Sequence, residues 1–164
     1  MMSNVPEAII DTLNGLLEAE VNSVFCFVLT SSPYMGQAPA EVKRIMQEMD
    51  SLCHEHRREL ATLIESLGGV PRVRNLVPDE EQYLSYLSLR FLLPKLVMEK
   101  DLLLTRFENA RATISNDYPQ VIEFLTRMVT EQRQHLEILK KNAVEITHGK
   151  YEPPVHGAGI ENRE

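Results

Sequence analysis

The spacing of apolar residues limits the fold of this chain more than any other feature of its sequence. They recur at alternating intervals of three and four along several long stretches. Such intervals place the side chains on one face of an α-helix, so the pattern predicts a bundle of four amphipathic helices. Three of the stripes are Ile10, Leu13, Leu17, Val24 and Phe27; Met46, Met49, Cys53, Leu60, Leu63 and Leu67; and Val121, Phe124, Met128, His135 and Leu139.

Turn residues separate these stretches. The first helix is expected to open after Asn4 and to stop at the turn cluster "SSPYMGQAP", and the second should start near residues 38–41. Gly68 and Gly69, followed by Pro71, are typical of a helix end. The turn "ISNDYPQ" precedes the fourth helix, which should run to about His148.

The third helix is the least regular. Its pattern runs from about Glu80 to Ser115, with Pro94 inside. A proline within a helix removes a backbone hydrogen bond, so we expect a kink or a break there. Residues 81–93 could then form a separate short helix. The domain interpretation is one bundle over residues 1–148 and an extended or disordered tail over 149–164, where two prolines and two glycines interrupt any periodicity.

Composition excludes several classes of function. The net charge of −7 argues against a nucleic-acid partner, because an acidic surface repels phosphate. The uncharged stretch 21–40 contains Pro33, Gly36 and Pro39, so it is not expected to cross a membrane. The N-terminus lacks the layout of a signal peptide, and two cysteines are too few for a disulfide framework. These features together predict a cytoplasmic protein.

Each expected helix carries one ionisable residue on its apolar stripe, near the middle of the helix. These residues are Glu20, His56, Glu99 and His135. The midpoints of packed helices share one level, so the four side chains are expected to meet in one layer of the core. A buried carboxylate without a partner is costly, and a cation between the four groups would remove that cost.

This layout resembles the ferritin-like superfamily, the bacterioferritin and rubrerythrin type of di-iron carboxylate bundle. The similarity is carried by "LNGLLEAEVNSVFCFV" around Glu20, "HRRELATLIESLGGVP" after His56, "EQRQHLEILKKN" around His135 and, in the third helix, "VMEKDLLLTRFENA". It spans roughly residues 8–145. The resemblance implies a ferritin-like four-helix bundle in which a long crossover makes helices two and three parallel.

The length of that crossover makes a further demand. A 30-residue helix is about 45 Å long, whereas residues 68–80 reach only about 40 Å when fully extended. Residues 81–93 are therefore expected to contribute to the crossing, with Pro94 near the start of the main third helix.

The ligand pattern of the family is incomplete in this chain. The family places a glutamate three residues before each ligand histidine, where this chain has Cys53 and Gln132. Glu131 shares a helix face with His135 and could replace one carboxylate, and Cys53 could bind a softer metal such as zinc or ferrous iron. The implied metal ligands are therefore Glu20, Cys53, His56, Glu99, Glu131 and His135.

The register of the third helix leaves a second possibility open. If Phe107 takes the place of the family's aromatic residue, the ligand position falls on Lys100 instead of Glu99. An ammonium group could then replace a cation and pair with Glu20.

His54 lies where bacterioferritins carry the methionine that binds haem, two residues before the ligand histidine. The resemblance therefore implies a haem ligand at His54. The alternative is a solvated or dimer-facing histidine.

Two functions follow from the resemblance. The first is a metal-binding protein that holds iron, or else manganese or zinc, and acts as a ferroxidase-like or peroxidase-like oxidoreductase. The second is a bundle that has lost its metal site and serves as a structural or partner-binding protein without a cofactor. In both cases we expect a homodimer, because apolar faces such as "YLSYLSLRFLL" are extensive for a monomer.

Overall fold

A computed structural model describes residues 5–23, 40–74 and 88–147. These residues form four α-helices and the turns beside them, with no strand among them. The helices are α1 (Glu7–Val21), α3 (Ala40–Ser66), α4 (Leu89–Thr113) and α5 (Pro119–Thr147). The prediction of an all-α four-helix arrangement is confirmed. The expected second half of the first helix, residues 75–87 of the expected crossover and the expected tail lie outside the described residues.

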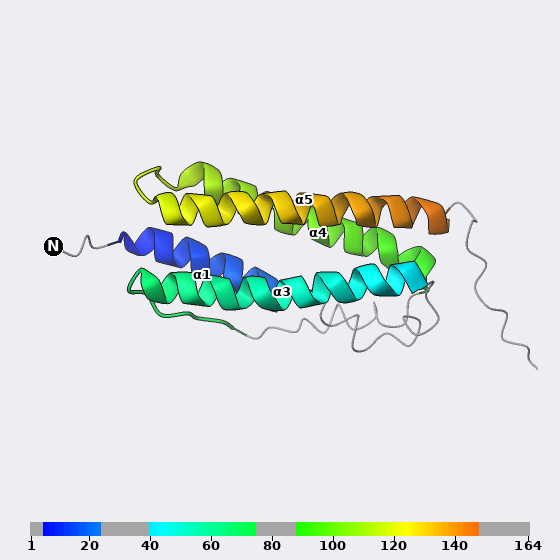
Figure 1. Cartoon of the computed structure of the whole chain (residues 1–164), viewed down its shortest axis with the longest axis horizontal. Coiled ribbons are helices and arrows are strands. Elements are labelled where there is room, and N and C mark those ends of the chain that lie inside the picture. The colour runs from blue at the N-terminus through cyan, green and yellow to red at the C-terminus, as the bar shows by residue number, and fades with distance from the viewer. Residues whose placement is uncertain (1–4, 24–39, 75–87, 148–164) are drawn as a thin grey trace, which may run out of the picture.

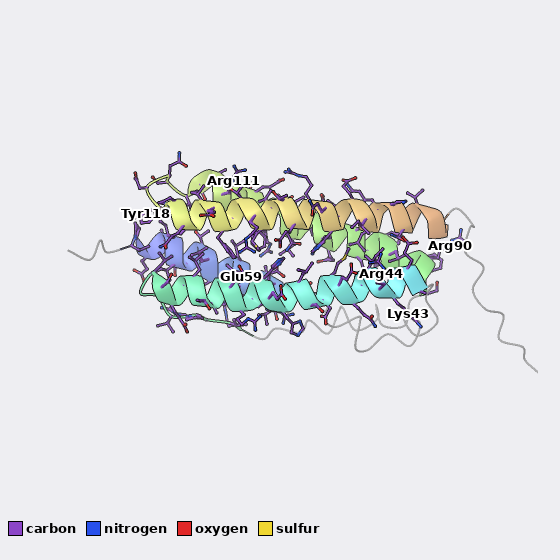
Figure 2. All side chains as sticks on the ribbon, viewed as in Figure 1. Lys43, Arg44, Glu59, Arg90, Arg111 and Tyr118 are labelled. Carbon is purple, nitrogen blue, oxygen red and sulfur yellow. The ribbon has the colours of Figure 1, made fainter. Side chains whose placement is uncertain are left out.

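The four helices lie side by side along one axis (Figure 1). Figure 2 shows Lys43 and Arg44, near the start of α3, at the same end of the bundle as Arg90, at the start of α4. Arg111, near the end of α4, lies toward the opposite end, as does Tyr118. Helices α3 and α4 therefore run in the same direction.

The residues that directly follow α3, 67–74, are described. Helix α3 ends in a Schellman motif, in which the Gly69 N–H donates to the Ile64 carbonyl and the Gly68 N–H donates to the Glu65 carbonyl. Gly68 has φ +81°, a conformation that glycine adopts without steric cost. The two glycines thus turn the chain back at the end of α3, as the sequence predicted.

After this turn, the chain is held against α1 by asparagine side chains. The Asn14 amide donates to the Val70 carbonyl (3.2 Å) and its oxygen accepts from the Arg72 N–H (2.7 Å). Just after α1, the Asn22 amide donates to the Arg74 carbonyl (2.9 Å). Residues 70–74 therefore run along α1 in the direction opposite to α3.

Apolar side chains from all four helices fill the core. Helix α4 packs most extensively against α5, and α1 against α3. Phe107 of α4 is fully buried in this cluster, as are Leu13, Leu60 and Leu125. Pro94 is the sixth residue of α4 and not the site of a break, because α4 begins at Leu89 and places the proline in its second turn. This agrees with the expectation that Pro94 lies near the start of the third helix.

Candidate functional site

A layer of polar side chains crosses the apolar core. It consists of Glu20 from α1, His56 from α3, Lys100 from α4, and Gln132 and His135 from α5, and we call it the polar layer. All five residues are between 0 and 8% exposed. They lie inside because each occupies a position of the buried stripe of its helix. Buried polar and charged groups need partners, so the contacts within the layer decide its chemistry.

Glu20 and Gln132 form the central contact of the polar layer. The Gln132 amide donates to Glu20 Oε1 at 2.7 Å. His56 Nδ1 lies 3.6 Å from the same carboxylate oxygen and 3.4 Å from the Gln132 nitrogen. From the sequence alone, Gln132 marked only the place of an absent glutamate. Its position on the buried stripe of its helix indicated that it lies inside, where its amide can donate to Glu20.

Glu131 joins the polar layer from its edge. Its Oε2 lies 2.6 Å from His56 Nε2, and its side chain is 29% exposed. Arg127 lies one turn earlier on α5 and pairs with both Glu131 and Glu59. The two nitrogens of His56 thus face two carboxylates, one buried and one connected to the surface.

The two histidines of the layer are shifted in opposite directions. Burial acts to lower the pKa of His56, but the hydrogen bonds and negative charges of Glu20 and Glu131 together raise it above 6.5. The pKa of His135 is lowered from 6.5 to about 4 by burial, by the positive charge of Lys100 and by that of His56. His135 is therefore neutral at physiological pH, while His56 is held in its charged form over a wider range.

These shifts predict how stability depends on pH. Below pH 6.5 His135 is protonated in the unfolded chain but stays neutral in the folded protein until about pH 4. The free energy of unfolding therefore falls by about 2 kcal/mol between about pH 7 and about pH 5. His56 acts oppositely: its stabilisation is complete below 6.5 and is lost as the pH rises through its raised pKa. Chemical unfolding at several pH values should show a maximum near neutrality.

Substitutions identify the two limbs of this profile. His135→Gln should flatten the acid limb, and His56→Gln should flatten the alkaline limb. His54→Gln removes an exposed imidazole from the same helix as His56 and is the matched control substitution. An acid limb that persists in His135→Gln would contradict the assignment.

Helix α4 presents Lys100, and not Glu99, to the polar layer. Lys100 is 0% exposed, as is Phe107 two turns later, whereas Glu99 is half-buried. The alternative register considered from the sequence is therefore the one observed. One residue corresponds to a rotation of about 100° around a helix, so Glu99 and Lys100 cannot both face the core.

The helix midpoints were only partly a guide to the layer. His56, Lys100 and His135 do lie near the middle of their helices, but Glu20 lies in the last turn of α1, which ends at Val21. Because the second half of the expected first helix lies outside the described residues, the midpoint expectation for Glu20 stays a prediction. Among the described residues, the C-terminal end of α1 meets the layer.

Several acceptor atoms of the layer have no hydrogen-bond partner among the described residues. They are Glu20 Oε2, Gln132 Oε1 and His135 Nδ1. Each of the three can accept a hydrogen bond. These atoms could therefore accept from a further donor or contact a cation.

The other candidate ligands lie apart from these contacts. Cys53 is fully buried one turn before His56. His54 is exposed, and its Nδ1 lies 2.9 Å from the Asp50 carbonyl oxygen. Within residues 5–23, 40–74 and 88–147, no three His, Cys, Asp or Glu side chains are grouped as metal ligands.

The residues present do not fit a dinuclear carboxylate centre. Such a centre needs several carboxylates to bridge two cations and balance their charge. Here Glu20 is the only fully buried carboxylate of the layer, both nitrogens of His56 face carboxylates, and an ammonium group shares the interior. Glu20 and Glu131 are instead faced by the two nitrogens of His56, and Lys100 brings a further positive charge that acts on His135.

Comparisons with known proteins do not assign the chain to a family. No protein-family model matches it, and no curated protein sequence matches it. In the part of the chain that the structure describes, no helix has an apolar stretch long enough to cross a membrane.

Proposed function

We propose that this chain is a ferritin-like bundle that works without a metal centre and serves as a dimeric structural or partner-binding protein. In this proposal Lys100 takes the place of a metal ion, with His56 as the second positive charge. The observation that carries the proposal is the complete burial of Lys100 in the layer that also contains Glu20 and His56. A lysine is almost never fully buried unless it is paired.

The register of α4 supports this proposal. With Phe107 and Lys100 facing inward, the four carboxylate positions of the ferritin-like pattern hold Glu20, Cys53, Lys100 and Gln132. Only one of the four is a carboxylate. The helix count and the common direction of α3 and α4 are compatible with the same lineage.

The charges of the polar layer give a physical reason why a metal ion would bind weakly there. A divalent cation beside Lys100 would add two positive charges to a buried site that is already balanced when His56 is protonated. Binding would have to expel protons from His56 or Lys100, and that cost subtracts from the affinity for the metal. The ammonium group carries its own charge into the core and needs no supply of metal.

A second candidate is the metal-binding oxidoreductase. It is favoured by the acceptor atoms of the layer that have no hydrogen-bond partner among the described residues, Glu20 Oε2 and His135 Nδ1 among them. A single iron, manganese or zinc ion would then be held by Glu20, His56 and His135, with Glu131 at the edge. Its haem variant would use His54. Glu99 and Cys53, the other ligands implied by the resemblance, have no observation in their favour.

Metal analysis distinguishes the two candidates. The full chain is purified without added metal, then incubated with ferrous, manganous or zinc ions, and its metal content and thermal unfolding are measured. We expect less than one tightly bound ion per chain and an unchanged unfolding temperature. Stoichiometric metal that disappears in a His56→Ala/His135→Ala variant would reject the metal-free proposal. The predicted cytoplasmic location is tested separately by fractionation.

A further inference from the structure

Helix α4 is apolar on two opposite faces. Its inner face contributes Leu92, Leu96 and Phe107 to the core. Its outer face carries Phe91, Lys95, Met98 and Leu102, which we call the outer stripe. Phe91, Met98 and Leu102 are 61%, 53% and 54% exposed. Three large apolar side chains on one exposed helix face mark a site of interaction with another protein.

The spacing of the outer stripe is that of a helix-pairing seam. Its residues are separated by four, three and four positions, the intervals at which side chains of one helix interlock with those of a second helix. The apolar pattern of the stripe ends at Leu102, because the next position of the seam is Thr105, which is hydrophilic and exposed. Within the described residues 88–147, the seam is thus about three turns long.

The outer stripe is complementary to itself. In an antiparallel pair related by a two-fold axis between Lys95 and Met98, Phe91 lies opposite the partner's Leu102. Lys95 lies opposite the partner's Met98. The two-fold axis repeats each contact. The outer stripe of each copy therefore covers the outer stripe of the other, as an isologous dimer requires.

The charges beside the stripe fit the same arrangement. Lys95 is the one charged residue within the seam, and Glu99 and Asp101 flank the seam on the C-terminal side of its centre. In the antiparallel pair the ammonium of each Lys95 comes within reach of the partner's Glu99 and the partner's Asp101. A parallel pair would instead place the two Lys95 ammonium groups against each other. Charge pairs of this kind select orientation more than they add affinity.

We infer that the outer stripe of α4 is the surface through which two copies of this chain form an antiparallel, two-fold dimer. The inference rests on the dimeric form in the proposed function and identifies its interface. It does not depend on whether the polar layer holds a metal, because the outer stripe and Lys100 lie on opposite faces of α4.

The first test measures mass in solution. Sedimentation equilibrium of the full chain should give twice 18.8 kDa at micromolar concentration. Met98→Lys/Leu102→Lys should weaken the dimer by about 100-fold or more, so that the variant sediments as a monomer. Val70→Lys/Val73→Lys is the matched control, since these exposed valines lie on the segment that follows α3. It should remain a dimer, and far-ultraviolet circular dichroism should show that both variants keep their helices.

The second test reverses the charges. Lys95→Glu should weaken the dimer, and Lys95→Glu/Glu99→Lys/Asp101→Lys should restore it. A dimer that survives Met98→Lys/Leu102→Lys, or one that the triple charge reversal fails to restore, overturns the inference. A monomeric wild-type chain overturns both the inference and the dimeric form in the proposed function. Neither result affects the metal-free layer, which is judged by metal content and unfolding.

Discussion

Replacing Lys100 with methionine is expected to lower the free energy of unfolding by about 3–5 kcal/mol, the cost of leaving a buried charge without its counter-charge. Methionine keeps most of the volume and the flexibility of the lysine side chain but removes the ammonium group. The carboxylate of Glu20 would then remain buried with its Oε1 bonded to Gln132 and its Oε2 without a hydrogen bond from the described residues. Urea unfolding at neutral pH measures the loss.

A second substitution shows whether the loss comes from charge. Glu20→Gln removes the negative charge and keeps an oxygen that can accept from Gln132. In the Lys100→Met/Glu20→Gln variant we expect much of the lost stability to return, because neither charge is left alone. Lys140→Met removes an exposed lysine from α5 and should change stability by less than about 0.5 kcal/mol. Additive effects of the Lys100 and Glu20 substitutions would contradict the pairing.

The second large effect is expected from restoring carboxylates to the polar layer. Lys100→Glu/Gln132→Glu would place three buried glutamates around His56 and His135, close to the ligand set of the ferritin-like pattern. This variant should be unstable without metal, since like charges then meet in the core. It should gain about 4 kcal/mol of stability when ferrous, manganous or zinc ions are present at about 1,000 times their dissociation constant.

The matched control for this experiment is Lys100→Gln, which removes the ammonium without adding a carboxylate. It should show no metal-dependent rise in thermal stability. Adding His56→Ala to the restored variant should abolish most of the rise, because His56 would then no longer be a ligand. A metal-dependent rise of equal size in the wild-type chain would show that Lys100 does not occupy the place of a cation.

Local patterns in the sequence were sufficient for the helices and for most of the buried polar residues. The stripes predicted α3 and α5 to within a few residues, and Gly68-Gly69 predicted the end of α3, because a left-handed glycine is a local requirement. Glu20, His56 and His135 could be identified as buried because each interrupts an otherwise apolar stripe. These inferences need only the period of one helix.

The inner face of α4 could not be decided in this way. Phe91, Met98 and Leu102 form one apolar stripe and Leu92, Leu96 and Phe107 form another, so the period of the sequence is compatible with either face turned inward. Packing against α5 chooses the face that buries Phe107. That choice rotates Lys100 into the polar layer and leaves Glu99 half-buried.

Which side chains contact one another in the polar layer could not be predicted from the sequence either, because these contacts depend on the distances between helices. Glu131 and Gln132 are neighbours in the sequence, and either could have replaced the carboxylate that the ferritin-like pattern expects. Only the packed helices show that Gln132 reaches Glu20 while Glu131 reaches the far nitrogen of His56. Periodicity specifies which face of each helix is buried when that helix has one apolar face. The identity of the groups that meet across the core depends on the rotation and separation of whole helices, to which residues from all four contribute.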